Sequence, residues 1–460
     1  MSVLVRGGHV AGRGRADVRV DAGIITEVAD SLSRLPGEEV IEAAGGEVLP
    51  GLHDHHVHLR AWAAAAGSVQ AGPPAVRDRT GLARALTAGP PGRWVRAVGY
   101  HQSVAGPLDR WELDRLCPDR PVRVQHRSGA LWVLNSAALE RLGLDRSAPP
   151  GVERGSGGEP TGRIWREDEW LRDRVPRVAA DLGRVSRLAA ARGVTGFTDA
   201  TPGLTADAVG ELRAAVESGR VGQRLCVMAP LGADTGGSAR FSIGPVKVIL
   251  DDTRLPGLGE LASTVRAAHD TGRRVAVHCV TYVQAALTLA AIADAGPRPG
   301  DRIEHGALLG PDMIAEARRL GVTVVTQPGF VRERGDRYLS DVDPADMEDL
   351  WRLASLLRAG VGVAAGTDSP FGPADPWVAV RAATDRLTGD GVPLGTDESV
   401  PAGTAVQLWH GSATEPTRPR TIRAGAVADL CILAEPLGTG LSRLPEVTAT
   451  MVAGRRLDLA

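Results

Sequence analysis

The sequence has little lysine and little net charge, and it lacks long apolar runs. Of its 53 lysine and arginine residues only Lys247 is a lysine, a bias that fits a GC-rich coding genome better than a function. The formal net charge of -2 over 460 residues gives no electrostatic case for a nucleic-acid or membrane partner. No apolar run approaches the ~20 residues that span a bilayer, and residues 1–10 lack the basic and apolar parts of a signal peptide.

Cysteine is also scarce. The chain has four cysteines, which lie far apart and form no C-x-x-C pair: Cys117, Cys226, Cys279 and Cys431. This absence of close pairs argues against a structural zinc finger and is typical of reduced, buried thiols. We therefore expect a cytoplasmic protein, with a homodimer as an open alternative.

The stretch Pro50–Leu59 reads Pro-Gly-Leu-His-Asp-His-His-Val-His-Leu and concentrates four histidines. Alternate residues of a β-strand project from the same side, so His56 and His58 share one face. Two imidazoles placed in this way form a chelating pair for a divalent metal such as zinc. A metal-storage tract or an affinity tag would be more polar than this run. We expect His53 and His55, on the other face, to pack or to support the ligands.

After this stretch, apolar strand-like segments recur, most of them followed by an Ala/Leu-rich stretch typical of an amphipathic helix. The segments are residues 193–199, 224–228, 246–251, 275–278, 302–305, 322–328 and 361–368. Together with the histidine strand they make eight strands in βα alternation, the number found in a (β/α)₈ barrel. The sequence therefore predicts an α/β fold with a TIM-like barrel over residues 49–423.

The remaining segments predict two additions to the barrel. Residues 1–48 and 424–460 alternate apolar and polar positions with Gly and Asp between them, which predicts one small β-sandwich domain built from both termini. Residues 60–188 are far too many for a connecting loop after the first barrel strand. Since they contain strand-like pieces at 94–101 and 121–126, we expect an insertion at the barrel mouth.

Polar groups lie on or at the ends of several predicted barrel strands, where side chains converge on the active face. They are His56, His58, Lys247, His278, His305 and Asp368. One histidine after an apolar strand is more often a hydrogen-bonded core residue than a ligand. Six metal-compatible groups on the strands of one chain favour a metal centre.

These residues stand in a familiar order. The series Pro50-Gly51-x-x-Asp54-x-His56-x-His58, then Val-Lys, His, Glu-His and Gly-Thr-Asp, resembles the metal-dependent amidohydrolase superfamily over nearly the whole chain. The insertion is similar to that of the YtcJ-like branch (amidohydrolase family 3), which includes N-substituted formamide deformylases. Its Pro-Val strand and later Trp-Val-Asn-Ser-Ala-Leu-like segment correspond here to 121–122 and 132–139. The Asp-Gly-His of that branch is replaced by His-Arg-Ser-Gly at 126–129, which leaves the substrate open.

The resemblance implies a ligand set for one or two divalent ions, Zn²⁺ first, with Mn²⁺ or Fe²⁺ as alternatives. The set is His56, His58, Lys247, His278, His305 and Asp368. In binuclear members the lysine is carboxylated and bridges two metals, a task that the guanidinium of arginine cannot do. The alternative is a plain Lys247 that pairs with Asp251 or with a substrate carboxylate.

The function that the resemblance implies is hydrolysis of a carbon–nitrogen bond in a small-molecule substrate, an amide, formamide or related compound, by metal-activated hydroxide. A bound metal lowers the pKa of water from ~15.7 to near 7. Asp368 would act as general base and then acid, and His278 or His305 would help to polarise the carbonyl group. One alternative is an aminohydrolase (deaminase) acting on a cyclic amidine, although Cys279-Val280-Thr281 lacks the glutamate usual there. The other is a catalytically silent barrel scaffold.

Several further residues are candidates for contacts with the substrate, and for each a structural role is an equal alternative. They are His101, His126, Arg127, Trp132 and Asp199, with Arg163 and Trp165 as residues that close over the site. We expect Glu304 to pack or to orient a neighbour rather than to bind metal. The segment 328–343, with Arg332 and Arg334, is either a lid with a carboxylate-binding arginine or a solvated charged loop.

Overall fold

The computed structural model describes residues 2–73, 75–88, 92–144, 148–176, 180–438, 441 and 443–459. The chain divides into two compact units. The larger unit contains Met1–Leu59 and Leu182–Ala460, and the smaller contains Arg60–Asp181, which covers most of the expected insertion. Among the described residues, no helix combines the length and the apolar character that crossing a membrane requires.

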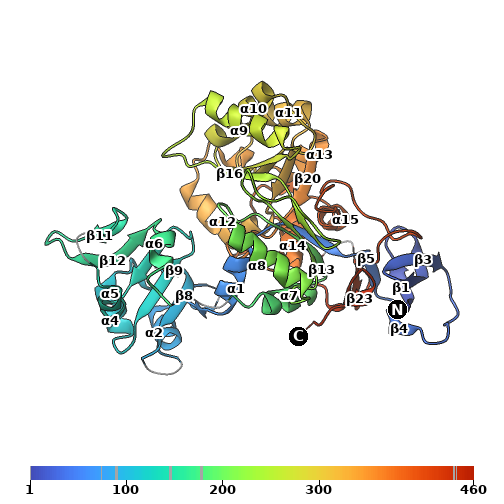
Figure 1. The fold of residues 1–460 in the computed structure, drawn as a ribbon, viewed down its shortest axis with the longest axis horizontal. Coiled ribbons are helices and arrows are strands. Elements are labelled where there is room, and N and C mark those ends of the chain that lie inside the picture. Colours follow the sequence, from blue (N-terminus) through green and yellow to red (C-terminus); the bar gives the residue numbers. More distant parts are fainter. Residues whose placement is uncertain are drawn as a thin grey trace. The chain divides into compact units, whose positions relative to one another are not determined.

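In the larger unit, both ends of the chain contribute to one eight-stranded sheet, in which the blue and red strands of Figure 1 lie together. The strands are β1 (Val3–Val10), β2 (Gly14–Asp21), β3 (Ile24–Ala29), β4 (Glu39–Glu42), β5 (Glu47–Pro50), β21 (Leu430–Leu433), β22 (Val447–Val452) and β23 (Arg455–Arg456). Apolar side chains from both termini, such as Val5 and Met451, pack in one core. One sheet is thus built from both ends of the chain. Its arrangement as a two-layered sandwich stays a prediction.

The remaining strands of this unit form two parallel sheets. The first has the order β15-β14-β13-β6, and the second runs from β16 to β20 in sequence order. Their bounds are β6 (Leu52–Val57), β13 (Val194–Asp199), β14 (Arg224–Val227), β15 (Phe241–Ile243), β16 (Val246–Ile249), β17 (Val275–Cys279), β18 (Arg302–His305), β19 (Thr323–Thr326) and β20 (Gly362–Ala365). The predicted strands and the α/β class are confirmed. Closure of the two sheets into a barrel stays a prediction.

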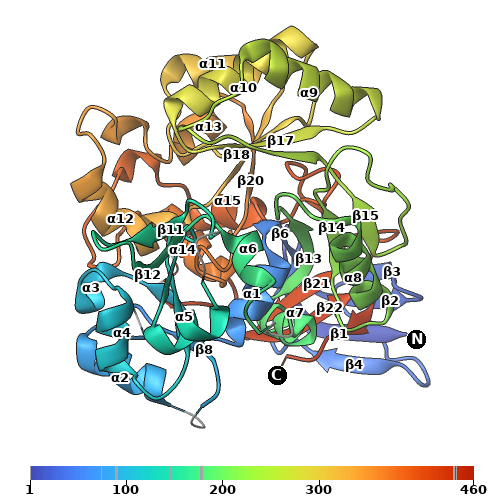
Figure 2. The same ribbon diagram turned by 60° about the vertical axis from the view of Figure 1, so that its left-hand side comes forward.

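Helices connect these strands: α7 (Leu182–Ala190), α8 (Ala206–Glu217), α9 (Leu258–Asp270), α10 (Tyr282–Ala295), α11 (Pro311–Leu320), α12 (Gly329–Asp341), α13 (Leu353–Arg358), α14 (Pro376–Asp385) and α15 (Ala402–Gln407). Their apolar faces explain their positions: α9, for example, buries Leu261 and Val265 on one side. A capping box of Thr281 and Gln284 begins α10 directly after β17. Figure 2 shows α9, α10 and α11 on one side of the sheet that contains β17 and β18.

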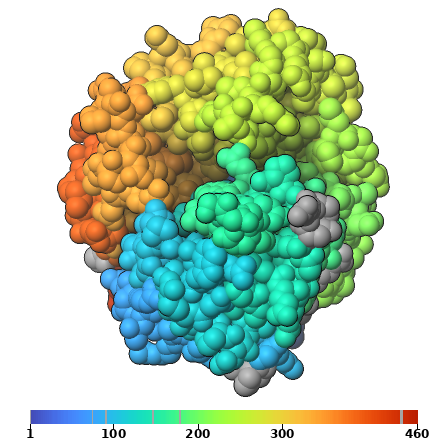
Figure 3. Space-filling model, turned by 90° about the vertical axis from the view of Figure 1, so that its left-hand side faces the viewer, coloured from blue at the N-terminus to red at the C-terminus, as the bar shows by residue number. Residues whose placement is uncertain are grey.

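The smaller unit has its own sheet and core, and its surface is blue to green in Figure 3. The sheet has the order β11-β12-β10-β9-β8-β7, with β7 (Val69–Gln70), β8 (Val95–Tyr100), β9 (Val122–His126), β10 (Leu131–Leu134), β11 (Val152–Arg154) and β12 (Pro160–Trp165). Helices α2 (Arg79–Thr87), α3 (Gln102–Ala105), α4 (Arg110–Leu116), α5 (Ser136–Leu142) and α6 (Asp168–Arg172) complete it, and α1 (Leu59–Ala66) leads into it. The two strand-like pieces expected here are β8 and β9.

Candidate metal centre

The end of β6 and the chain after β20 meet through backbone hydrogen bonds. The N–H of Asp368 donates to the carbonyl of His56 at 2.8 Å, and the N–H of His58 donates to the carbonyl of Ser369 at 2.9 Å. Asp54 strengthens this junction, because its carboxylate accepts from the Thr367 N–H at 2.9 Å and from the Thr367 hydroxyl at 2.5 Å. Residues more than 300 positions apart are therefore held side by side.

This junction brings three potential metal ligands together: His56, His58 and Asp368. One ligand atom of each lies within 4.8 Å of the others, and all three side chains are buried. The Nε2 atom of His58 is 2.9 Å from Oδ1 of Asp368, and that of His56 is 3.5 Å away. Ligands at about 2.1 Å around a tetrahedral ion lie about 3.4 Å apart. The donor types and their spacing therefore fit one divalent ion.

A buried carboxylate orients His56. Glu304, at the end of β18, accepts a hydrogen bond from Nδ1 of His56, and Arg302 donates to the same carboxylate at 2.7 and 3.2 Å. Burial by itself would raise the pKa of Glu304, but Arg302 and His56 hold it well below its usual value. Since Nδ1 of His56 carries the proton, its Nε2 lone pair is left for a metal.

His305 and His278 complete a group of neighbouring rings. Nδ1 of His305 donates to the side-chain oxygen of Gln327 at 2.7 Å. The His305 ring centroid lies 4.8 Å from that of His56 and 4.6 Å from that of His278. Burial, followed by the charge of Lys247, lowers the pKa of His278 to about 4. These imidazoles are thus neutral near pH 7, which is the form that binds metals.

The amino group of Lys247, on β16, is buried and has no hydrogen-bond partner among the described residues. Burial lowers its pKa, although Glu304 and Asp368 oppose the shift. Asp251 accepts instead from the backbone N–H and the hydroxyl of Thr253, at 3.0 and 2.8 Å. An unpaired ammonium is costly to bury, so the environment favours the neutral amine or a modified group at this position.

Two of the candidate ligands have strained backbones. His305 has a φ of 72° and Asp368 a φ of 55°, in the left-handed region that non-glycine residues rarely adopt. Such strain persists where the surroundings over-determine the conformation, and it is concentrated at functional sites. In both residues the unusual φ turns the chain at the end of a strand, where the side chain joins the cluster.

The other histidines of β6 have structural contacts. Nε2 of His53 is hydrogen-bonded to the Thr198 hydroxyl at 2.9 Å, and the rings of His53 and His55 contact each other at a tilt of 36°, with 4.5 Å between their centroids. Asp199, a candidate for substrate contact, accepts from the backbone N–H groups of Leu59 and Thr201 at 2.8 and 3.0 Å. These contacts fix the chain that follows His58.

The remaining candidates lie in the smaller unit. Trp132 is buried in its core, where its indole N–H donates to Asp168 at 2.8 Å, and Arg96 and Arg123 each stack on it with Cζ 5.2 Å from the ring centroid. The structural alternative accounts for this residue. Glu153 accepts hydrogen bonds from both Arg163, at 3.2 Å, and Trp165, at 3.1 Å.

His101 follows β8 and His126 is the last residue of β9, and the two have matching local contacts. In each, Nδ1 is 2.8 Å from the hydroxyl of the serine two residues later and 3.2 Å from its backbone N–H. The two rings lie 6.0 Å apart. Arg127, between His126 and Ser128, donates its backbone N–H to the carbonyl of Tyr100 at 2.8 Å.

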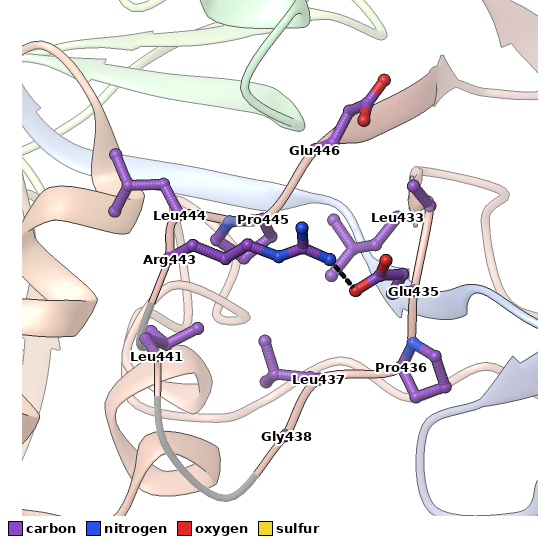
Figure 4. A pocket seen from close by; sticks show the side chains of 11 residues that line it. Leu433, Glu435, Pro436, Leu437, Gly438, Leu441, Arg443, Leu444, Pro445 and Glu446 are labelled. Carbon is purple, nitrogen blue, oxygen red and sulfur yellow. Dashed lines mark hydrogen bonds and ion pairs between the residues drawn. The ribbon is translucent and has the colours of Figure 1, made fainter.

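One cavity lies elsewhere. Its volume is about 340 Å³ and it is lined by described residues between Leu433 and Glu446, in the connection from β21 to β22 (Figure 4). Glu435 and Arg443 form an ion pair across it, and the other side chains drawn are mostly leucines and prolines. It contains none of the clustered histidines, so we do not assign the function to this cavity.

Three further residues, Gln327, Arg302 and Asp54, contact a candidate ligand or fix the chain that carries it, and the sequence alone predicts no role for them. Asp54 was part of the quoted motif, and the polar residue after the β19 segment was a signal for Gln327. Burial raises the pKa of Asp54 to about 7, even though its hydrogen bonds to Thr367 oppose the shift.

Known proteins are similar to this chain over nearly its full length. The sequence profile of the amidohydrolase family matches residues 39–458. N-substituted formamide deformylase from Arthrobacter pascens is 26% identical over 98% of this chain and 94% of its own length. Putative amidohydrolase YtcJ from Bacillus subtilis is 24% identical over 91% of this chain and 90% of its own.

A solved structure described as an uncharacterized metal-dependent hydrolase from Pyrococcus horikoshii has the same fold. It superposes with a TM-score of 0.77 at 21% identity, covering 95% of this chain and 98% of the other. The parallel α/β fold and the family profile agree. The chain belongs to the amidohydrolase family.

Proposed function

We propose that this protein is a metal-dependent hydrolase that cleaves a carbon–nitrogen bond of an amide, formamide or related compound. The observation that carries the proposal is the buried cluster of His56, His58 and Asp368, with ligand atoms within 4.8 Å of one another. The relative named N-substituted formamide deformylase supports the choice of bond, because it matches this chain over almost its whole length.

His56, His58 and Asp368 would hold one divalent ion, with Zn²⁺ favoured by the nitrogen-rich donor set. Such an ion supplies Lewis acidity and an acidified water at neutral pH. Lys247, His278 and His305 would hold a second. For this, the neutral amine of Lys247 would add to CO₂, forming an N–C bond and releasing one proton, and the resulting carbamate would offer oxygen ligands. The lowered pKa of Lys247 favours the amine that reacts.

Asp368 is the general base and then the general acid in this proposal. Burial would raise its pKa, but the hydrogen bond from His58, followed by electrostatic attraction to the nearby imidazole rings, holds it far below its usual value. The carboxylate is therefore ionised and able to accept a proton at Oδ, which it then passes to the leaving nitrogen. His305 gives its Nδ1–H to Gln327 and keeps only a lone pair for a metal. Where a single ion is bound, His278 would be a neutral N–H donor that stabilises negative charge on the substrate oxygen.

The proposal includes closure of the two parallel sheets into a barrel. The backbone hydrogen bonds between the end of β6 and residues 368–369 support closure on one side. On the other side, only Gly244 and Pro245 separate β15 from β16, so one run of chain contributes to both sheets. A cytoplasmic location and a homodimer stay predictions.

The test combines metal analysis with a substrate panel. Protein purified without chelator should contain at least one equivalent of Zn²⁺, Mn²⁺ or Fe²⁺, and it should release amine from N-formyl, N-acyl, carbamate or lactam compounds. Dialysis against a chelator should abolish turnover, and the metal should restore it. Asp368→Asn should leave the circular dichroism spectrum unchanged and remove activity.

Two results would contradict the proposal. Release of ammonia from cyclic amidines, without hydrolysis of any compound in the panel, would assign the protein to the deaminases. Substoichiometric metal together with no activation by added Zn²⁺ or Mn²⁺ would indicate a catalytically silent scaffold.

A further inference from the structure

The guanidinium of Arg334, on α12, has no anionic partner among the described residues. Its Nε atom is buried without a hydrogen-bond acceptor, and the group stacks on Phe330 with Cζ 3.9 Å from the ring centroid. By contrast, Arg337 on the same helix pairs with Asp341 at 2.9 Å. Arg334 thus presents a charge, and an N–H donor, that the described part of the chain leaves uncompensated.

One side of this guanidinium contacts the segment that carries Asp368. Arg334 donates from Nη2 to the carbonyl oxygen of Phe371. The Phe371 N–H donates in turn to the carbonyl of Asp368 at 2.8 Å. The Phe371 ring packs edge-on against His58, with 5.3 Å between the ring centroids. A single residue therefore separates the charge of Arg334 from two candidate metal ligands.

The other side contacts the segment that orients His305. Phe330, on which the guanidinium stacks, donates its backbone N–H to the carbonyl of Gln327 at 3.1 Å. The side chain of Gln327 is the one that accepts from His305 at 2.7 Å. Arg334 therefore bridges the chain after β19 and the chain after β20, beside the cluster of histidines.

The surroundings of this charge are mainly aromatic. Trp351 packs against Phe330 and Tyr338, with ring centroids 5.6 and 6.3 Å apart. Burial raises the pKa of Tyr338, so its hydroxyl is uncharged and does not neutralise the arginine, whose charge opposes that shift. Arg302, another cation near the centre, is already paired with Glu304 at 2.7 Å.

We propose that Arg334 binds a carboxylate of the substrate, so that the enzyme acts on N-acylated or N-formylated amino acids rather than on neutral amides. The inference rests on the proposed function, whose substrate class it names. A guanidinium presents five N–H donors in a planar fork that matches a carboxylate. A buried N–H without an acceptor is unfavourable until a ligand supplies one, and apolar walls strengthen the resulting ion pair.

The test measures ligand binding separately from turnover. The dissociation constants of N-acetylglycine and N-acetyl-phenylalanine, and of their neutral carboxamides, would be measured by calorimetry on the metal-replete protein. We expect the acid of at least one pair to bind about tenfold to a hundredfold more tightly than its amide. Arg334→Met should remove this preference, Arg334→Lys should retain part of it, and Arg337→Gln, the matched control on the same helix, should leave it unchanged.

Equal binding of acid and amide in both pairs by the natural protein would overturn the inference, and so would a preference that survives in Arg334→Met. If Arg334→Met does not fold, the acid–amide comparison in the natural protein and in Arg334→Lys decides. Hydrolysis of N-formyl compounds distinguishes the two proposals. A protein that hydrolyses neutral formamides with no preference for acids keeps the proposed function and loses this inference. One that binds acids more tightly but hydrolyses nothing keeps only the contact of Arg334 with a carboxylate, and both the proposed function and the substrate class named here are overturned.

Discussion

Histidines occur in both units of the molecule, but they are held in different ways. In the larger unit, His56 donates to Glu304, which is 248 positions away, and His305 donates to a side chain that follows a neighbouring strand. In the smaller unit, His101 and His126 each bond to a serine two residues later, and His126 also bonds to Gln102, which is 24 positions away. A hydrogen bond between residues two positions apart stabilises a turn whatever the place of that turn in the fold. A bond from a distant strand fixes the direction of a ring, which is what a metal ligand requires.

Backbone strain at these two groups of residues follows the same division. His305 and Asp368 adopt positive φ angles of 72° and 55°. His101 has a φ of −137°, which is ordinary extended backbone. A conformation of this kind costs about 1–3 kcal/mol and persists only where its surroundings hold it. The histidine cluster of the larger unit therefore includes residues with a strained backbone. In the smaller unit, the backbone of His101 has no such strain.

The largest predicted effect is at the cluster itself. His56→Ala removes a ligand, so we expect loss of bound metal and a fall in kcat/KM beyond the roughly 10–100-fold that follows loss of a supporting residue. Metal content by mass spectrometry and steady-state kinetics would measure both. His126→Ala in the smaller unit is the matched control, with an expected fall of less than about tenfold. Equal losses in the two variants would remove the distinction between the two kinds of histidine.

A smaller effect is expected from the residue that orients the ligand. Glu304→Gln keeps an acceptor for His56 but leaves the charge of Arg302 without a partner. We expect metal affinity to fall about 10–100-fold, as for other residues that support a ligand. Competition with a chromogenic chelator would measure it. The double variant Arg302→Met/Glu304→Gln removes both charges. It tests whether the unpaired buried arginine or the lost orientation of His56 lowers the metal affinity. Unaltered affinity in Glu304→Gln would show that the long-range hydrogen bond does not support the metal ligand.

Much of this site was predictable because its elements have local signals. Strand periodicity placed His56 and His58 on one face, and short apolar runs located the strands that carry Lys247 and His305. The family pattern then linked Asp368 to them. Backbone geometry decides which residues of a strand share a face, so the spacing of residues in a single sequence is enough to predict it.

The supporting contacts were not predictable in the same way. The pairing of Glu304 with His56 depends on which strands are neighbours and in what register, and neither is encoded in one segment. The approach of Phe371 to His58 depends on the positive φ of Asp368, a turn that no local pattern indicated. Side-chain positions in the insertion depend likewise on its own sheet order.

A buried histidine outside the cluster, His410, extends the comparison of histidines to the pH dependence of stability. Burial, aided by Arg420, lowers the pKa of His410 to about 3, and its Nε2 has no hydrogen-bond partner in the described structure. As the pH falls through about 6.5, His410 binds a proton in the unfolded chain but stays neutral in the folded chain. Neutral His410 therefore makes its full contribution to the free energy of unfolding above that pH. This contribution is lost as the pH falls toward 3, by at most about 1.4 kcal/mol per unit.

Urea unfolding of the metal-free protein between pH 7 and 5 would measure this loss. His410→Gln should show a shallower decrease in the free energy of unfolding, because one buried imidazole fewer resists protonation. Identical slopes for the natural protein and the variant would show that burial of His410 does not govern its acid response.

The smallest effect is expected at the local bonds of the smaller unit. Ser128→Ala removes the hydroxyl that lies 2.8 Å from Nδ1 of His126, and Ser103→Ala does the same for His101. Because these contacts are exposed and the backbone N–H of each residue remains, the free energy of unfolding should fall by less than about 1 kcal/mol, with kcat/KM unchanged within about twofold. Urea unfolding and kinetics on the best N-formyl substrate would test both. A tenfold loss of kcat/KM at unchanged stability would mean that the local turns also orient histidines for the substrate. Local and long-range hydrogen bonds to histidine would then have the same function in the two units.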